Sequence, residues 1–415
     1  MIDINFIREN SEKVKEACEK KQVKVDVDKI LELDKKKREL MTKMEALRSE
    51  QNKISRGEHN DANISKAKEL KNQFKELEPE LKKTEEELQN LLVLLPNIPF
   101  DDVPVGKDDS ENVIVRQVGQ PSLKLRHGEV KNYMQLGEAL DLIDTERAGK
   151  VSGSRFGYLK NELALLEFAI VGFVMENVRK QGFIPVIPPV LLKDEIARGT
   201  GYFEAIDEKE AYYFPEDKIY LAGTSEQPLV AMHASEILEE KDLPLRYIGF
   251  STCFRREAGS YGKDTKGILR VHQFDKLEMV VFSKPDDSIK EHQLLLSLEE
   301  RMMKQLGLPY QLVNICTGDL GRPAAAKYDI ETWLPSEQKY RETHSTSNCT
   351  DFQARRLNIR YRDKSGKINF VHTLNGTAFA IGRILIMIIE NYQQKDGSIK
   401  VPRALQKYCG FKIIK

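Results

Sequence analysis

The sequence predicts an α+β protein, in which an N-terminal antiparallel helical coiled-coil arm precedes a domain built on an antiparallel β-sheet flanked by helices. The arm is indicated by two stretches in which apolar residues recur at alternating spacings of three and four. The sheet is indicated by runs rich in aromatic and β-branched residues, of which 245–254 and 268–282 enclose a polar, Gly-containing segment as hairpin strands do. Residues 96–113 are rich in Pro, Asp and Gly, so we expect one domain over residues 1–110 and another over 111–415.

Composition restricts the function classes. With 65 basic and 65 acidic residues the chain has no net charge, so a nucleic-acid partner would require a local basic patch. The five cysteines are scattered, without a C-x-x-C pair or the His spacing of a zinc site, so we expect reduced thiols and no zinc. The longest apolar run near the start, residues 91–95, is too short to span a bilayer. We therefore expect a cytoplasmic protein with no membrane partner.

The arm is predicted from apolar seams over residues 30–54 and 67–95, separated by the polar segment 55–65. Two long helices in an antiparallel hairpin, closed at that segment, are the simplest geometry. Pro79 lies inside the second helix and is expected to kink it or open its hydrogen-bond ladder. Basic residues over 35–56 could line a nucleic-acid backbone, but interleaved acidic residues also fit a solubilising helix face, and charge alone leaves both readings open.

The remaining elements are read from periodicity and from stop signals. Helices are predicted at residues 1–20, 133–148, 159–181, 227–238 and 378–391, and further strands at 183–192, 219–226, 310–316, 328–334, 339–345 and 369–374. Three prolines in the strand at 183–192 favour an edge or interface strand covered by a twin subunit. The last helix is nearly all apolar, so Arg383 within it requires an anion, either an internal carboxylate or a ligand phosphate.

Alternation along the strand at 268–282 separates an apolar face from a chemical one. The chemical face carries Arg270, His272, Phe274, Lys276 and Glu278, and the end of the preceding strand adds Arg255 and Glu257. Arginines can grip a polyphosphate, and an aromatic ring with an arginine plane can enclose a purine, although a solvated hairpin face is the alternative.

Near the end of the strand at 219–226, Thr224 and Glu226 share a side and could hold an amino group. Helix N-capping explains Thr224 or Ser225 equally well.

These stretches together resemble a class II aminoacyl-tRNA synthetase, and within that class the chain is similar to the seryl-tRNA synthetase family over essentially its whole length. GFIPVIPPVL, FRREAGS with the downstream RVHQF, and NGTAFAIGRILIMIIENYQ resemble the three class-defining motifs. The segments GTSEQP, QFDKLEM and SNCTDFQARR, together with the N-terminal hairpin, resemble the serine-specific features.

The resemblance implies a class II synthetase catalytic domain with a seven-stranded antiparallel sheet. It implies a serine:tRNA ligase that uses ATP to form seryl-adenylate and passes the seryl group to tRNA(Ser), with use of tRNA(Sec) left open. Mg²⁺ and a homodimer are also implied. The arm would lie along the variable arm of the tRNA bound to the other subunit and read shape and backbone.

The resemblance also assigns site residues. Arg255, on the α-phosphate and the serine carboxylate, and Arg383, on the γ-phosphate, are expected to be catalytic. Serine is expected to meet Thr224, Ser225, Glu226, Arg255, Glu278, Asn375 and Thr377, with its amino group at Thr224 and Glu226 and its hydroxyl at Glu278 and Thr377. ATP is expected to meet Arg255, Arg256, Glu257, Val271, Phe274, Glu342, Thr343, His344, Ser345 and Arg383, with the adenine amine at Glu257 and the base on Phe274.

Magnesium is expected at Glu342 and Ser345. His344 is bulkier than the residue usual in the family, so a metal-binding imidazole and a packed histidine both stay open. Two other functions also stay open. An enzyme that loads a carrier protein would lack the arm, and a non-catalytic coiled-coil protein would have no reason to keep Arg255, Glu278 and Arg383.

Overall fold

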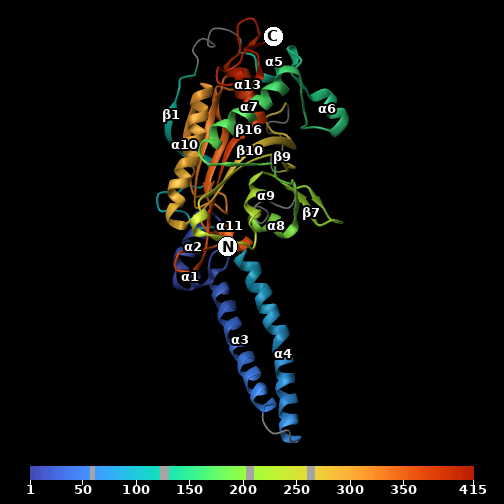
Figure 1. Cartoon of the computed structure of the whole chain (residues 1–415), viewed down its shortest axis with the longest axis vertical. Coiled ribbons are helices and arrows are strands. Elements are labelled where there is room, and N and C mark those ends of the chain that lie inside the picture. Colours follow the sequence, from blue (N-terminus) through green and yellow to red (C-terminus); the bar gives the residue numbers. More distant parts are fainter. Residues whose placement is uncertain (57–60, 122–129, 202–209, 259–266) are drawn as a thin grey trace. The chain divides into compact units, whose positions relative to one another are not determined.

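The computed structural model describes residues 1–56, 61–121, 130–201, 210–258 and 267–415. Within them the chain forms two compact units, Met1–Ile98 and Pro99–Lys415. The first is helical and the second is built on a largely antiparallel sheet, so the predicted fold class is confirmed (Figure 1). No helix in these described ranges is both long and apolar enough to cross a membrane.

The division between the units lies before residue 110 because the segment that follows Ile98 packs with the second unit. Phe100 donates its backbone N–H to the carbonyl of Ala325 at 2.9 Å. Val103 is buried in a small cluster with Leu320 and Ala324. The Pro-rich segment after the arm is therefore anchored to the sheet unit.

The first unit contains four helices within its described residues: α1 (Ile4–Glu9), α2 (Ser11–Lys20), α3 (Val27–Ser55) and α4 (Asp61–Leu92). The single helix predicted over residues 1–20 is wrong, because the backbone leaves helical geometry at Asn10, with φ of −134°. Asp3 caps α1 by accepting from the backbone N–H of Asn5 at 2.7 Å.

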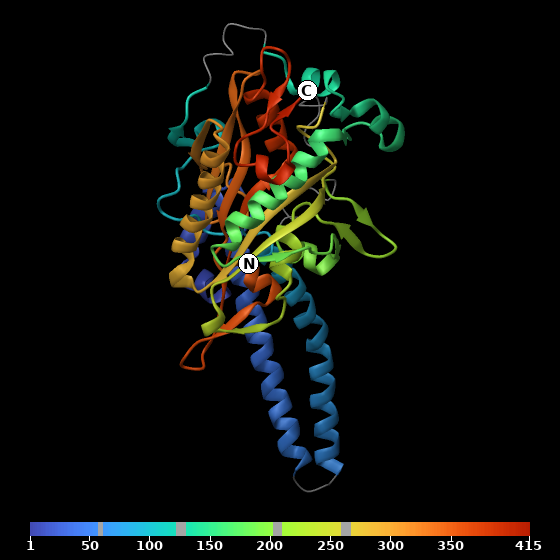
Figure 2. The same ribbon diagram turned by 45° about the horizontal axis from the view of Figure 1, so that its top comes forward.

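Helices α3 and α4 lie side by side in both views (Figures 1 and 2). Ion pairs fix their antiparallel register: Lys36 lies 2.7 Å from Glu80, and Glu50 lies 2.8 Å from Lys66. Later residues of α3 pair with earlier residues of α4, so the two helices run antiparallel, as the two apolar seams predict. The predicted tip falls partly on residues 57–60, which lie outside the described residues. Helix α4 continues through Pro79, whose missing N–H removes one bond from its ladder.

The second unit is organised by a sheet that has eight strands within the described residues. Their order is β1 (Val113–Val118), β11 (Tyr310–Asn314), β12 (Ala326–Leu334), β13 (Lys339–Asn348), β16 (His372–Ala380), β10 (Gln273–Ser283), β9 (Leu245–Phe254) and β4 (Ile184–Val186). All neighbours are antiparallel except β4 and β9. Seven of the eight strands form the expected antiparallel sheet, including β1, which periodicity did not predict, and the eighth is the parallel edge strand β4. The Pro-containing β4 is an edge strand, as predicted.

Three helices cover the apolar face of this sheet: α7 (Asn161–Arg179), α10 (Ser288–Leu306) and α12 (Ile381–Asn391). Figure 1 shows α7 and α10 lying against the strands. Leu277, Met279 and Val281 of β10 are fully buried in this core, so the apolar face predicted from alternation is confirmed.

The remaining elements are short and surround the sheet. They are α5 (Tyr133–Ala139), β2 (Ile143–Asp144), α6 (Thr145–Ser152), β3 (Tyr158–Leu159), β5 (Leu191–Lys193), α8 (Asp194–Gly199), β6 (Tyr213–Phe214), β7 (Ile219–Leu221), α9 (Glu226–Ala231), β8 (Ile237–Glu239), α11 (Phe352–Leu357), β14 (Arg360–Arg362), β15 (Ile368–Phe370), β17 (Ile399–Lys400), α13 (Gln406–Cys409) and β18 (Ile413–Ile414).

Several predicted boundaries are wrong because tertiary pairing overrides local preference. The helix predicted at 133–148 is two helices separated by β2. The helix predicted at 227–238 ends at Ala231, since residues 237–239 pair with β14. The second hairpin strand begins at Gln273, and the last helix begins at Ile381, because Phe379 and Ala380 still pair with β10. Most of the hairpin tip, residues 259–266, lies outside the described residues.

Two β-bulges determine which side chains share the exposed face of the sheet. Between β12 and β13, Ile330 pairs with His344 but Glu331 pairs with Glu342, which leaves Thr343 as an extra residue. Between β10 and β16, Leu277 pairs with Phe379 but Glu278 pairs with Thr377. Each bulge reverses the alternation beyond it.

Candidate active site

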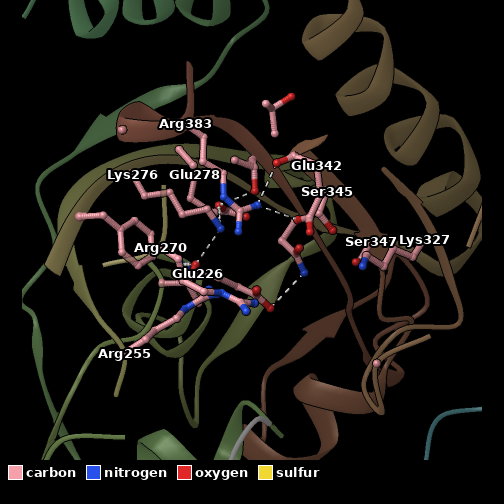
Figure 3. A pocket seen from close by; sticks show the side chains of 18 of the residues that line it. Glu226, Arg255, Arg270, Lys276, Glu278, Lys327, Glu342, Ser345, Ser347 and Arg383 are labelled. Carbon is pink, nitrogen blue, oxygen red and sulfur yellow. Dashed lines mark hydrogen bonds and ion pairs between the residues drawn. The ribbon is translucent and has the colours of Figure 1, made fainter. Parts of the chain in front are cut away.

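A pocket of about 360 Å³ is lined by residues of β10, β16, β13 and β12, several of which are labelled in Figure 3. This volume is in the range of small-molecule sites. Lys276 and Glu278 of β10 line the pocket, whereas Leu277 and Met279 pack with α7 and α10, so the pocket lies on the opposite face of the sheet. The predicted residues that line it are Thr224, Glu226, Arg255, Glu257, Val271, Phe274, Glu278, Glu342, Thr343, Ser345, Asn375, Thr377 and Arg383. Side chains from segments far apart in the sequence therefore meet in one cavity.

Three predicted residues do not line the pocket. Ser225 shares a hydrogen bond with Ser251 at 2.7 Å. The guanidinium of Arg256 lies 5.7 Å from the centre of the Tyr212 ring. His344 is fully buried, with Nδ1 2.8 Å from Thr343 Oγ1 and its ring edge-on to Phe379. Burial lowers the pKa of His344 to about 3, and this geometry is that of a packed, neutral histidine.

One end of the pocket is built around two buried carboxylates. Glu226, in the first turn of α9, accepts from Asn375 Nδ2 at 3.0 Å and from Gln353 Nε2 at 2.8 Å. Gln353, on α11, was missed by the sequence reasoning, although it lies within the motif SNCTDFQARR. The amide donors hold the Glu226 side chain in place at the pocket wall.

The second carboxylate is Glu278, whose side chain is 1% exposed. Lys276 Nζ lies 2.5 Å from Glu278 Oε2, and Thr377 Oγ1 donates to the same oxygen at 3.3 Å. Lys276 Nζ also donates to Thr224 Oγ1 at 3.2 Å. Burial raises the pKa of Glu278, while Lys276 and Thr377 act against that rise. This end presents a buried acceptor surrounded by short polar side chains.

Arg255 and Phe274 also line the pocket and contact each other. The Arg255 guanidinium lies 5.3 Å from the Phe274 ring centre, and its Nε donates to the carbonyl of Gly223 at 3.0 Å. Arg270 Nε lies 2.9 Å from Glu257 Oε2, and the Glu257 backbone has φ of +52°. A left-handed backbone is costly for a glutamate, so the surrounding structure holds this residue in place.

Arg383 faces the pocket from the first turn of α12, with 28% of its side chain exposed. It donates to the Glu342 carbonyl at 2.9 Å and lies 3.4 Å from Glu342 Oε1. The Glu342 carboxylate therefore supplies part of the negative charge that this arginine requires, while the guanidinium remains accessible from the pocket.

Glu342 and Ser345 line the same wall, although regular alternation would place residues three apart on opposite faces. The bulge at Thr343 brings them together. The Glu342 side chain is 48% exposed, and the charges of Arg383, Lys327 and Arg255 hold its pKa below the usual value, so the carboxylate is charged. Among the described residues, no group of three or more His, Cys, Asp or Glu side chains is placed to hold a metal ion.

Lys327, which the sequence reasoning missed, lines the pocket beside Ser347, its partner across β12 and β13. Its Nζ lies 3.0 Å from Asp329 Oδ2. Burial raises the pKa of Asp329 to about 7. Lys327 and Asp329 lie two residues apart on β12 and share a face, but only the pairing of β12 with β13 brings Lys327 beside Ser347 in the pocket.

The sheet is antiparallel, and a charged pocket lies on one of its faces. An arginine reaches this pocket from the helix that follows the last central strand. These features define a class II aminoacyl-tRNA synthetase core. Residues 212–392 match the tRNA synthetase class II core domain (G, H, P, S and T), and residues 1–99 match the seryl-tRNA synthetase N-terminal domain. The chain belongs to the seryl-tRNA synthetase family.

Individual relatives support this membership along the whole chain. The serine–tRNA ligase of Thermobifida fusca is 46% identical over 99% of this chain and 98% of its own length. Seryl-tRNA synthetase from Pyrococcus horikoshii, solved with ATP, has a TM-score of 0.93 and 43% identity, covering 100% of this chain and 99% of its own. Cytoplasmic serine–tRNA ligase from Naegleria fowleri, solved with AMP, has a TM-score of 0.90 and 34% identity at the same coverage.

Proposed function

We propose that the protein is a serine:tRNA ligase, which activates L-serine with ATP to form seryl-adenylate and transfers the seryl group to tRNA(Ser). The observation that carries this proposal is one pocket that combines two buried carboxylates, Glu226 and Glu278, with Arg255, Phe274 and Arg383. The carboxylates suit a small zwitterion with a hydroxyl group. The arginines and the aromatic ring suit a purine nucleotide with its phosphates.

Serine recognition rests on the carboxylate end. The ammonium group of serine would lie between Glu226 and Thr224, and its hydroxyl would donate to Glu278 beside Thr377. Asn375 would hold the Glu226 carboxylate in position. Alanine would leave the buried Glu278 acceptor without a donor, and an unpaired buried acceptor discriminates more strongly than an apolar pocket does.

The arginines and Phe274 would position ATP for attack by the serine carboxylate on the α-phosphorus, with pyrophosphate as the leaving group. The adenine ring would stack on Phe274 and offer its amine to Glu257, with Val271 beside it. Arg255 would bind the α-phosphate and the serine carboxylate, and Arg383 the γ-phosphate. Catalysis of this kind depends on positioning and charge neutralisation, so a protein nucleophile is not required.

Glu342 and Ser345 fit a magnesium ion bound mainly by water and phosphate. The carboxylate is charged and the hydroxyl lines the same pocket wall, which gives two hard oxygen donors. When bound, the ion would neutralise charge on the phosphates of ATP. His344 packs away from this wall and would contribute no ligand.

We further propose that tRNA(Ser) binds along α3 and α4, whose basic residues would contact phosphate and follow the shape of the RNA. A homodimer is supported by exposed apolar residues on α7 and around the edge strand β4: Leu165, Phe168, Ile184 and Ile187. A cytoplasmic location is supported by five free cysteines.

The test is exchange of pyrophosphate into ATP, run side by side with serine, threonine, alanine and glycine, followed by charging of tRNA(Ser). Exchange driven by serine, with seryl transfer to tRNA, is the expected result. Serine activation without transfer to tRNA would favour a carrier-protein ligase. No exchange by folded protein with magnesium would favour a non-catalytic binding protein.

A further inference from the structure

Glu299 is a fully buried carboxyl group on α10, beneath the sheet and outside the pocket. The Thr346 hydroxyl is the one hydrogen-bonding side chain that acts on its carboxyl group, and neither carboxyl oxygen nor Thr346 Oγ1 has any other partner among the described residues. A buried carboxyl group with so few hydrogen bonds is costly, and an alanine or leucine would avoid that cost. Nothing in the proposed reaction uses this group directly.

The carboxyl group of Glu299 lies against the backbone of β16. A Cβ atom on Gly376 would lie 2.9 Å from Glu299 Oε1, 3.4 Å from Thr346 Oγ1 and 3.5 Å from Leu295 Cβ. Thr346 is the cross-strand partner of Gly376. Glu299 and Thr346 therefore occupy the space where a side chain at position 376 would be.

Gly376 separates two residues that line the pocket from the opposite face of the same strand. On one side of it, Asn375 donates to Glu226, and on the other, Thr377 donates to Glu278. A displacement of the strand at Gly376 would move both donors relative to their carboxylates. The packing beneath Gly376 therefore affects both the Asn375–Glu226 and the Thr377–Glu278 hydrogen bonds.

We propose that Glu299 is a positioning residue: its side chain supports β16 at Gly376 from behind the sheet and thereby sets the positions of Asn375 and Thr377 around the amino acid. This inference rests on the proposed function. Glu299 touches no substrate and acts only through the strand.

The protonated form of Glu299 is the one compatible with this location. Burial raises the pKa of Glu299 well above its usual range. The charged groups that act on it are Glu278 and Lys276 from β10 and Asp329 from β12. His292, also on α10, donates from Nε2 to the Thr346 carbonyl at 3.1 Å, and burial lowers the pKa of this imidazole, so it is neutral. No described cation pairs with Glu299, so ionisation at alkaline pH would disturb the packing under β16.

The test compares full-length wild type with Glu299→Ala, Glu299→Gln and the control Met302→Ala in serine-dependent pyrophosphate exchange. Met302 is also fully buried on α10 and belongs to the main core. We expect Glu299→Ala to raise the KM for serine about tenfold, with the KM for ATP unchanged, since only the amino-acid contacts are misplaced. Met302→Ala should leave both KM values unchanged. Glu299→Gln should keep the wild-type KM for serine at pH 7.

The pH profile supplies the second readout. The KM for serine of the wild type should rise at alkaline pH, and Glu299→Gln should lack that rise because its amide cannot ionise. Equal KM values for Glu299→Ala and Met302→Ala, or an alkaline rise retained by Glu299→Gln, would overturn the inference. The glutamine variant keeps the test decisive if the alanine variant does not fold. Absence of serine-dependent exchange in wild type would overturn the proposed function, and this inference with it.

Discussion

Lys276 Nζ lies 2.5 Å from Glu278 Oε2, and both side chains line the pocket from the same face of β10. The ammonium group opposes the effect of burial on this carboxyl group. A hydrogen-bond acceptor for a small hydroxyl is thus kept inside a protein core by one lysine and one threonine. The proposed selectivity for serine depends on this arrangement.

Glu278→Ala should impair the use of serine far more than the use of ATP. Loss of the acceptor for the serine hydroxyl should raise the KM for serine by on the order of 100-fold in pyrophosphate exchange. The KM for ATP should change little. Glu331→Ala is the matched control, because Glu331 lies on β12 of the same sheet and does not line the pocket. Equal losses for serine and ATP would remove Glu278 from the specificity role.

Arg383→Ala should act on the nucleotide. We expect kcat/KM for ATP to fall by on the order of 100-fold, because the cation proposed to bind phosphate is lost, while the KM for serine stays near wild type. Arg341→Ala is the control, because it removes the ion pair between Arg341 on β13 and Glu337, which precedes that strand. A similar decrease in both variants would indicate a general effect on the sheet.

Shortening the arm should separate amino-acid activation from tRNA charging. Two ion pairs, Lys36 with Glu80 and Glu50 with Lys66, define the register of α3 and α4. In this register residue 44 of α3 lies opposite residue 72 of α4. Excision of residues 44–72, closed by a short turn, should leave serine-dependent exchange intact and abolish charging of tRNA(Ser). Charging that survives the excision would show that the distal arm does not read the RNA.

His344→Leu should leave the magnesium requirement unchanged and alter the pH dependence of stability. The folded-state pKa of His344 is about 3, against 6.5 for a free imidazole. Between about pH 6.5 and pH 3 the imidazole is therefore protonated in the unfolded chain and neutral in the folded chain. The free energy of unfolding falls by about 1.4 kcal/mol for each pH unit of acidification in this window. The variant should lack this contribution in urea unfolding at pH 7 and pH 5. A higher magnesium requirement would instead support an imidazole ligand.

Glu299→Gln should stabilise the protein increasingly as pH rises. The folded-state pKa of Glu299 lies well above that of the unfolded chain, so its favourable contribution is complete below about pH 4.5 and is lost as pH rises towards the folded pKa. The free energy of unfolding of the variant relative to wild type should grow by about 1.4 kcal/mol per pH unit in that window. Urea unfolding at pH 5, 7 and 8 measures it, and a difference independent of pH would contradict the raised pKa.

Elements in which apolar residues recur regularly over many positions were predictable from the sequence. The seams of α3 and α4 and the alternation of Phe274, Lys276 and Glu278 depend on neighbours within one helix or strand. Elements defined by distant partners were not. The strand β8 forms where a helix was predicted, since residues 237–239 gain backbone hydrogen bonds from β14. The arginine at 383 could be recognised as needing an anion, but its partner Glu342 could not be deduced.

The sequence by itself determined the arm, the charged face of β10 and the motif residues, because spacing along one segment dictates which side chains share a face. The tertiary structure alone decided that Glu342 and Ser345 meet on one wall, that Lys327 joins them and that Glu299 lies beneath Gly376. These relationships depend on bulges and on strand pairing. One extra residue in a ladder reverses the face of every side chain beyond it, and only the partner strand shows where that residue lies.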